Sequence, residues 1–328
     1  MKTNLRFIGI DVSKDTLDIG IYSEEEKSTV IKNNKKAILK YFNTLLSNKN
    51  VSHVCIENTG KYSWVLMELL PELDCYFYVV NPLHLKRSLG LIRGKNDKID
   101  AIRIAEFIKK NFQEIKPYIP QREEINLMQI LLSERRFKVK QRKQLKTKNK
   151  ENCILSNKTI AKTLTKKNDK LIKELTKQII ELEREIKQLI SNDEQLKTLN
   201  KQLKSIPGVG DILCWNVLVK TNEFKTITDP RKLACYAGVA PFANTSGISI
   251  FGRNKVSNYA DKGLKKILHL GALSAIRLEN DLAYYYHRKV EEGKNKMLVL
   301  NAVRNKIIHI IFALIKNQEF YNNRLFMS

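Results

Sequence analysis

The first hundred residues alternate between short apolar runs and segments in which apolar residues recur at helical spacing. The pattern predicts strands over Phe7–Val12, Thr16–Tyr22, Ser28–Ile31, Val51–Glu57 and Cys75–Val80, and helices over 35–47 and Lys61–Leu70. The first strand is almost continuously apolar and is therefore expected at the centre of a sheet. Three strands with hairpin-length links, followed by strand and helix alternation, predict a mixed sheet flanked by helices.

The middle of the chain predicts long helices. Leucines recur every seven residues from Leu175 to Leu203, and isoleucines occupy the other seam position at Ile172, Ile179 and Ile186. A heptad stripe of this length needs a partner helix. Isoleucine at one seam position and leucine at the other favours a parallel pair of two chains, while a hairpin against residues 125–150 would use the same stripe. We favour oligomerisation, as a dimer or tetramer.

The last third of the chain begins with the tight turn in "SIPGVGDILCWNVL", residues 205–218. Gly208 and Gly210 leave backbone N–H groups exposed at a helix start, where a phosphate can bind, as in a helix-hairpin-helix turn. Helices are expected over Arg231–Ala237, Lys262–Ile276 and Lys296–Ile315, and Ser246 is expected in a turn. The chain thus predicts an α/β domain over 1–120, a basic coiled-coil segment over 121–204 and a mainly α-helical domain over 205–328.

Composition adds a strong positive charge to this picture. The 328 residues contain 59 Lys and Arg against 34 Asp and Glu, a formal charge of +25. Such a surplus indicates a polyanionic partner, most commonly nucleic acid. Residues 135–150 hold nine basic residues and no acid. The candidate nucleic-acid contacts are Arg135, Arg136, Lys138, Lys140, Gly208, Gly210, Arg253 and Lys255.

Other function classes are disfavoured by the sequence. The longest apolar runs, such as Ile307–Ile315, fall short of the ~20 residues of a membrane span. No secretory signal pattern precedes the first strand, so the expected location is the bacterial cytoplasm, at the nucleoid when active. The five cysteines form no Cys-x-x-Cys pair, which argues against disulfides and zinc. His269, alone on an apolar helix, is expected to be a satisfied core residue.

Four acids are candidate metal ligands. Asp11 and Glu57 end two predicted strands, and their carboxylates meet at one sheet edge if those strands are parallel neighbours. Asp97 and Asp100 share one face of a predicted helix that could cross the same edge. Clustered carboxylates suit Mg²⁺ or Mn²⁺, which support phosphodiester cleavage. The alternative is that the aspartates merely favour a helix start. Asp18 is expected to face solvent.

Five sequence blocks carry a family resemblance. "FIGIDVSKDTLDI", "CIENTGKYSW" and "KNDKIDAIRIAEF" resemble the three acidic blocks of the DEDD transposases of insertion-sequence family 110 (the 110/1111 group), and the element order matches an RNase H-like fold. "SIPGVGDILCWNVL" and "LACYAGVAPFANTSGIS" resemble that family's C-terminal transposase domain. The resemblance implies that Asp11, Glu57, Asp97 and Asp100 are the metal-binding acids of a RuvC-like domain.

The same resemblance implies a wider mechanism. Ser246 would be the nucleophile that forms a covalent phosphoserine intermediate with DNA, with the RuvC-like domain and the serine coming from different subunits. A structured noncoding RNA encoded by the element would pair with donor and target DNA. We therefore expect a site-specific DNA transposase. The alternatives are a RuvC-type structure-specific nuclease that uses water, with Ser246 structural, and a non-catalytic nucleic-acid-binding scaffold.

Overall fold

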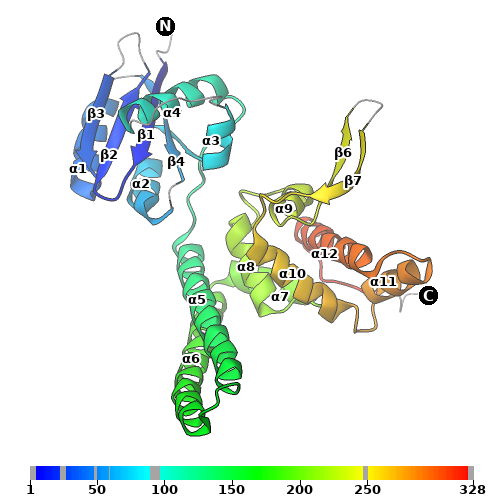
Figure 1. The fold of residues 1–328 in the computed structure, drawn as a ribbon. Helices are drawn as coiled ribbons and strands as arrows, with labels where there is room; N and C mark the ends of the chain where they lie inside the picture. The colour runs from blue at the N-terminus through cyan, green and yellow to red at the C-terminus, as the bar shows by residue number, and fades with distance from the viewer. Residues whose placement is uncertain are drawn as a thin grey trace. The chain divides into compact units, whose positions relative to one another are not determined.

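The computed structural model describes residues 5–22, 27–47, 50–58, 60–88, 97–246 and 250–323. The chain divides into two compact units, residues 1–120 and 121–328. The first unit is an α/β structure and the second is mainly helical (Figure 1). Each unit has its own buried apolar side chains, so each has a core of its own.

The first unit contains a five-stranded mixed sheet in the order β3-β2-β1-β4-β5. β1 and β2 are antiparallel, as are β2 and β3, whereas β1, β4 and β5 run parallel to one another. The strands are β1 Leu5–Val12, β2 Thr16–Ile21, β3 Lys27–Lys32, β4 Val51–Glu57 and β5 Tyr76–Val80. The predicted mixed sheet is thereby confirmed, with β1 at its centre.

Helices cover both faces of this sheet, because successive strand residues point to opposite faces. Ile8, Ile10 and Val12 of β1 pack on the face that is covered by α1 (Lys35–Leu46) and α2 (Trp64–Leu69). Phe7, with Cys55 of β4, lies on the opposite face, under α3 (Pro82–Ser88) and α4 (Asp97–Asn111). The α-helix expected over Lys61–Leu70 is shorter than predicted, because 3-10 turns at Gly60–Ser63 and Leu70–Glu72 take the place of its two ends.

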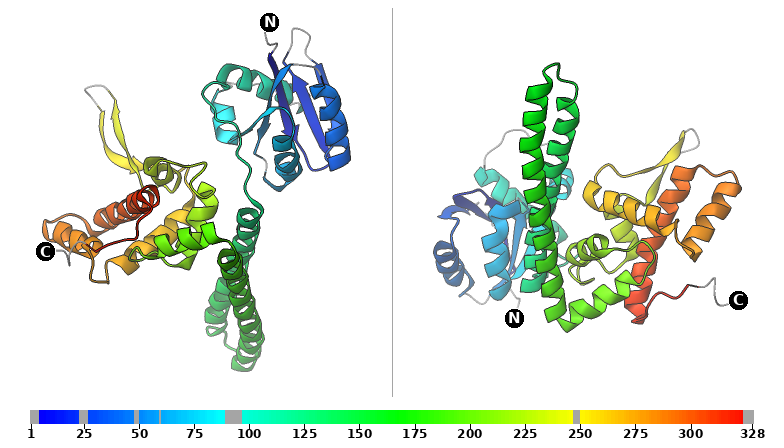
Figure 2. Two further views of the ribbon diagram at one scale, coloured as in Figure 1. Left: turned by 180° about the vertical axis from the view of Figure 1, so that it is seen from behind. Right: turned by 90° about the horizontal axis from the view of Figure 1, so that it is seen from below.

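The second unit begins with two long helices, α5 (Glu123–Asn152) and α6 (Lys158–Asn192), which lie side by side in all views (Figures 1 and 2). The predicted heptad stripe finds its partner here, because Ile179 and Ile186 are buried within this hairpin of one chain. The Nε of Arg135 on α5 lies 2.7 Å from the Oε1 of Glu183 on α6. Pairing between two chains stays a prediction. The heptad stripe does not require such pairing, because α5 of the same chain already packs against it.

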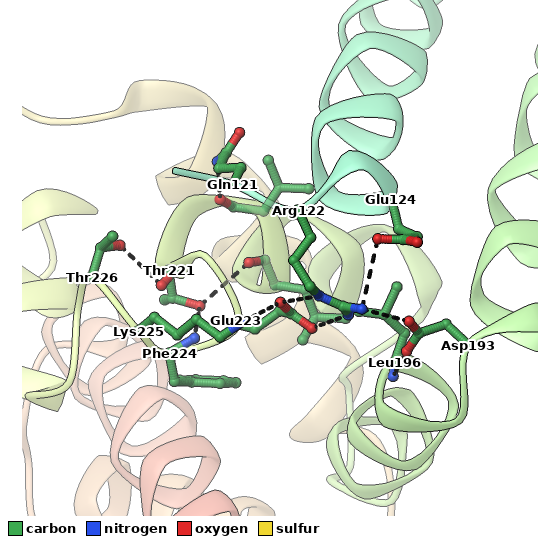
Figure 3. A network of polar contacts seen from close by, with 12 residues as sticks. Gln121, Arg122, Glu124, Asp193, Leu196, Thr221, Glu223, Phe224, Lys225 and Thr226 are labelled. Atoms are coloured by element: carbon green, nitrogen blue, oxygen red, sulfur yellow. Dashed lines mark hydrogen bonds and ion pairs between the residues drawn. The ribbon is translucent and has the colours of Figure 1, made fainter. Parts of the chain in front are cut away.

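The stripe does not continue as one helix. α6 ends at Asn192 and α7 (Glu194–Lys204) begins after Asp193, whose side chain accepts a hydrogen bond from the N–H of Leu196 at 2.7 Å. Arg122, just before α5, donates to Asp193 Oδ2 at 2.7 Å and to both carboxylate oxygens of Glu223, at 3.0 and 2.5 Å (Figure 3). This ion-pair network joins the start of α5, the α6–α7 break and the end of α8 (Asp211–Thr221).

The remaining helices form one core around Trp215, which is 1% exposed. They are α8 Asp211–Thr221, α9 Pro230–Tyr236, α10 Lys262–Ala275, α11 Asp281–Glu291 and α12 Lys296–Asn317. Between α9 and α10, strands β6 (Pro241–Ser246) and β7 (Ile250–Val256) form an antiparallel arm. Ser246, expected in a turn, is the last residue of β6 and pairs with Ile250, and the link between them, 247–249, lies outside the described residues. Its segment lacks the apolar alternation that signals a strand.

One described helix, α12, is long and apolar enough to cross a membrane by length and composition alone. Half of its most apolar window is buried inside the protein. Val303, Ile307 and Ile311 on this helix are fully buried in the core of the second unit. A core helix passes the same length and composition test, so α12 is weak evidence for a membrane span.

Candidate active site

Asp11 and Glu57 come together through strand pairing. β1 and β4 are parallel and in register from Leu5 with Val51 to Ile10 with Ile56, so Asp11 and Glu57 are the next residues on adjacent strands. Gly9 on β1 and Cys55 on β4 lie on the face covered by α4, and Asp11 and Glu57 each come two residues after them. Because side-chain direction alternates along a strand, the two acids project from the same face at the carboxyl ends of the strands.

Two glycines bring α4 onto this face. A Cβ on Gly9 would lie 2.2 Å from the carbonyl oxygen of Ala101, and one on Gly20 would lie 2.5 Å from the backbone nitrogen of Ile102. Gly9 and Gly20 are register partners on β1 and β2. Any side chain here would push α4 away, so the glycine pair sets the close contact between helix and sheet.

The amino end of α4 carries the other two candidate acids. Asp97 is its first residue and is exposed, and Asp100 lies half-buried in the same turn. Burial, followed by the charges of Asp97 and Asp100, raises the pKa of Asp11 above the usual aspartate value. Asp11 is therefore close enough to both aspartates of α4 for their charges to act on it, which a helix-start role for Asp97 and Asp100 does not require.

A fifth acid at this edge was missed by sequence reasoning. Asp18 is the register partner of Asp11 and lies two residues from Gly20, so it shares the α4 face. The prediction that it faces solvent is wrong, since it is half-buried and its pKa is raised by burial and then by the charge of Asp97. The sequence could not show this, because the position of Asp18 next to Asp11 depends on the antiparallel register of β1 and β2.

The candidate ligands are of the chemical type that binds divalent cations. Every candidate ligand is a carboxylate, and hard oxygen ligands are what Mg²⁺ and Mn²⁺ prefer. As placed, the side chains of the described residues include no group of three His, Cys, Asp or Glu that could hold a metal ion. Asp100 instead forms an ion pair with Arg103, with 2.9 Å between Oδ1 and Nη1. A bound cation would relieve the repulsion between these acids.

Ser246 belongs to the second unit, whereas the four acids belong to the first. It ends β6, and its side chain lies outside the described part of the structure, as do the side chains of Arg253 and Lys255 on β7. The arm starts next to Val239, whose carbonyl oxygen accepts a hydrogen bond from the Nδ2 of Asn301 on α12 at 2.8 Å. The base of the arm is thus fixed to the helical core.

The candidate nucleic-acid contacts on α5 differ in availability. Arg135 is bound to Glu183, and Lys138 pairs with Glu134 at 3.0 Å. Arg136 and Lys140 are exposed. The basic stretch therefore offers two of its four candidate residues to a ligand without breaking a pair within the chain.

The two turn glycines also differ from each other. A Cβ on Gly208, which has φ +81°, would lie 2.1 Å from the carbonyl oxygen of Gly271 on α10, so this glycine is needed for packing. Gly210 has no such neighbour within 4 Å and precedes α8. Asp211 occupies the first turn of α8, and its carboxylate is bound by Lys204 at 2.6 Å and Lys187 at 3.2 Å. The turn lines a cavity of about 1070 Å³ beside α10 and Arg136.

The three-layer arrangement, with acids gathered at the carboxyl ends of two parallel strands, defines an α/β domain of the RNase H-like class. The transposase family model DEDD_Tnp_IS110 matches residues 8–157, and the model of the transposase IS116/IS110/IS902 family matches residues 200–287. The chain belongs to this family of insertion-sequence transposases and is a DNA transposase or recombinase. Members of the DEDD group use a divalent metal.

Individual relatives agree with this assignment. The chain is 26% identical to the pilin gene-inverting protein of Moraxella bovis over 97% of its own length and 98% of that protein. It is 29% identical to an uncharacterized 43.6 kDa protein of insertion element IS110 from Streptomyces coelicolor, over 37% of this chain and 30% of that protein. A protein of insertion element IS900 from Mycobacterium paratuberculosis is 30% identical over 36% of this chain.

Proposed function

We propose that this protein moves or inverts a DNA segment by cutting and rejoining strands at defined sites, with four acids as metal ligands and Ser246 as nucleophile. The observation that carries the proposal is the strand register that puts Asp11 beside Glu57 on the face crossed by the first turn of α4. We include inversion in the proposal because a relative that matches nearly the whole chain is a pilin gene-inverting protein.

The acids would hold Mg²⁺ or Mn²⁺ through carboxylate oxygens of Asp11, Glu57, Asp97 and Asp100. When bound, such ions stabilise the charge that develops on phosphate oxygens. The chain's own contribution is to keep the acids together, through the β1–β4 register and the glycine contact under α4. Asp100 would have to leave Arg103 to take part.

In the proposed chemistry, the Ser246 hydroxyl oxygen attacks the phosphorus of a DNA phosphodiester. The serine–phosphorus ester forms as the bond to one strand end breaks, and the serine proton ends on the hydroxyl of that released strand. The ester conserves the energy of the phosphodiester, so a second strand end can displace the serine and restore an intact backbone. The position of Ser246 at the end of an arm agrees with a residue that must reach into a DNA substrate.

A covalent adduct is the decisive test of the serine. The wild type should yield a protein–DNA adduct on a suicide substrate in Mg²⁺, and Ser246→Ala should yield none, while the neighbouring Thr245→Ala retains it. Metal-dependent nicking that survives Ser246→Ala would favour a RuvC-type structure-specific nuclease. Recombination in cells that survives both Asp11→Asn and Glu57→Gln would favour a non-catalytic scaffold, with Asp15→Asn in the exposed β1–β2 turn as the control.

We further propose that an element-encoded noncoding RNA guides the choice of DNA site and that the active form is a homo-oligomer. The exposed Arg136 and Lys140 on α5 support RNA binding by charge and shape. Purification from cells that carry the whole element should recover a discrete RNA, and recombination should depend on it. Size measurement by light scattering, with and without that RNA, tests the dimer or tetramer.

A further inference from the structure

A buried arginine, Arg304, lies in the middle of α12. It is 6% exposed, and its buried Nε forms no hydrogen bond within the part of the chain that the structure describes. Among the described residues no carboxylate forms an ion pair with it, in contrast to Arg122, which has three. An uncompensated buried guanidinium is costly to the folded state, so an anion from outside the chain is the simplest way to balance it.

Two further nitrogen-bearing side chains converge on Arg304 from the neighbouring helix. Lys265 and His269 lie four residues apart on α10, which packs against α12. The pKa of each is lowered by burial and then by the positive charge of Arg304. The buried Nδ1 of His269 has no hydrogen-bond partner among the residues that the structure describes, so the expectation of a satisfied core histidine is wrong.

Asp261, the acid nearest to Lys265 in sequence, already has partners of its own. It precedes α10, accepts a hydrogen bond from the N–H of Leu264 at 2.9 Å, and pairs with Lys220 at 3.0 Å. Its negative charge is therefore committed at the start of α10 and is not among the charges that shift the pKa of Lys265. Lys265, His269 and Arg304 are here called the α10–α12 cluster. Within the described ranges of the chain, no acid forms an ion pair with any of the three.

The α10–α12 cluster lies at the base of the arm that carries Ser246. The side chain of Lys265 reaches Gly238, because a Cβ on that glycine would lie 3.8 Å from the lysine Cδ. Asn301, one turn before Arg304 on α12, binds the carbonyl oxygen of Val239. In Figures 1 and 2 the arm rises from the side of the unit where α9 and α12 lie.

We propose that the α10–α12 cluster is an anion site that binds one backbone phosphate of the nucleic acid engaged by the arm. The planar guanidinium of Arg304 offers paired donors to a phosphate, and the half-buried Lys265 provides the opening to solvent. A phosphate there would satisfy Arg304 and hold the strand at a fixed distance from Ser246. The nucleic-acid identity of the ligand rests on the proposed function, whereas the anion site itself does not.

Inorganic phosphate is the first probe, applied to the full-length chain. Phosphate should raise the melting temperature of the wild type above that in sodium chloride of equal ionic strength. Arg304→Met should raise the melting temperature without phosphate, because it removes a buried unpaired charge, and should abolish the increment due to phosphate. Arg277→Met removes an equal charge from an exposed position and should leave the increment intact.

Nucleic-acid affinity is the second measurement, made by fluorescence anisotropy on duplex DNA and single-stranded RNA of equal length over a range of salt. Arg304→Met should weaken binding of at least one of the two about tenfold and reduce its salt slope by about 0.9 on duplex DNA or 0.7 on a single strand. Arg304→Lys should retain part of the affinity, and Arg277→Met should retain more than Arg304→Met.

The proposal is overturned if Arg304→Met and Lys265→Met both keep the phosphate increment, or if neither weakens binding to DNA or RNA. Lys265→Met alone decides the matter should Arg304→Met fail to fold. If the phosphate increment depends on Arg304 but recombination is unchanged by Ser246→Ala, the anion site is supported and the serine mechanism is rejected.

Discussion

Replacing Arg122 by methionine removes the ion that holds three elements of the second unit together. The Glu223 side chain is 0% exposed and receives two hydrogen bonds from Arg122, so the substitution leaves a buried carboxylate with Lys225 as its remaining partner, at 3.0 Å. Breaking a buried pair costs about 3–5 kcal/mol, and the lower end of that range applies because Lys225 stays. For a unit of this size that lowers the melting temperature by about 6–12 °C.

The two tryptophans make the assay specific. Trp215 is buried in the second unit and Trp64, in the first, is 52% exposed. In a Trp64→Phe background, fluorescence during urea or thermal unfolding reports on the second unit alone. Glu124→Gln is the matched control, since it loses only a 3.6 Å contact to Arg122 on a carboxylate that is 39% exposed, worth less than about 1 kcal/mol.

The pH dependence provides an independent check. Burial acts to raise the pKa of Glu223, but the hydrogen bonds from Arg122 and Lys225 outweigh it and hold the pKa below the usual glutamate value. The stabilisation is therefore present above the unfolded-state pKa and is lost as the pH falls through the folded-state pKa. The difference in stability between wild type and Arg122→Met should shrink in acid.

The double variant Arg122→Met with Glu223→Gln should recover part of the loss, because it no longer buries an unpaired charge. Two results would refute the reasoning. One is an Arg122→Met variant as stable as Glu124→Gln, and the other is strict additivity in the double variant. Either would mean that the carboxylate of Glu223 is solvated by other means once Arg122 is gone.

Three further outcomes are expected. Gly9→Ala should destabilise the first unit by about 1–3 kcal/mol in urea unfolding and abolish recombination, because the new Cβ would lie 2.2 Å from the Ala101 carbonyl oxygen. Asp11→Asn should raise the melting temperature in EDTA at neutral pH, since a carboxyl whose folded pKa is raised destabilises the folded state when ionised. The same variant should reduce recombination more than about 100-fold. An unchanged or lowered melting temperature would contradict this. Arg136→Ala should lower the salt slope of nucleic-acid binding by about 1, whereas Arg135→Ala, already paired with Glu183, should change it less.

Much of the first unit follows from local sequence. β4 begins and ends where the apolar run Val51–Glu57 predicts, and β1 is central because both of its faces are covered. The placement of Asp11 and Glu57 at strand ends also followed from the pattern. Whether those strands were neighbours and parallel did not, because register is a property of pairing rather than of either strand.

The second unit shows the limits of periodicity. The heptad stripe predicted that α6 needs a partner, but a stripe carries no information on whether the partner belongs to the same chain. The stripe also ran past Asp193, where the helix ends because that side chain caps the next helix and binds Arg122, 71 residues away in sequence. The β6–β7 arm was missed because its sequence lacks the apolar alternation that predicts a strand, and its strands are defined by pairing with each other.

By itself the sequence determined the five strands of the α/β unit, the excess of positive charge and the four candidate acids, since these depend on residue type and on spacing along the chain. Only the tertiary structure decided that Asp18 lies beside Asp11, that Gly9 and Gly20 let α4 approach the sheet closely, and that Arg304 is buried with no ion pair among the described residues. Each of these depends on which atoms approach one another through space, and residues distant in sequence supply the partner, or fail to supply it.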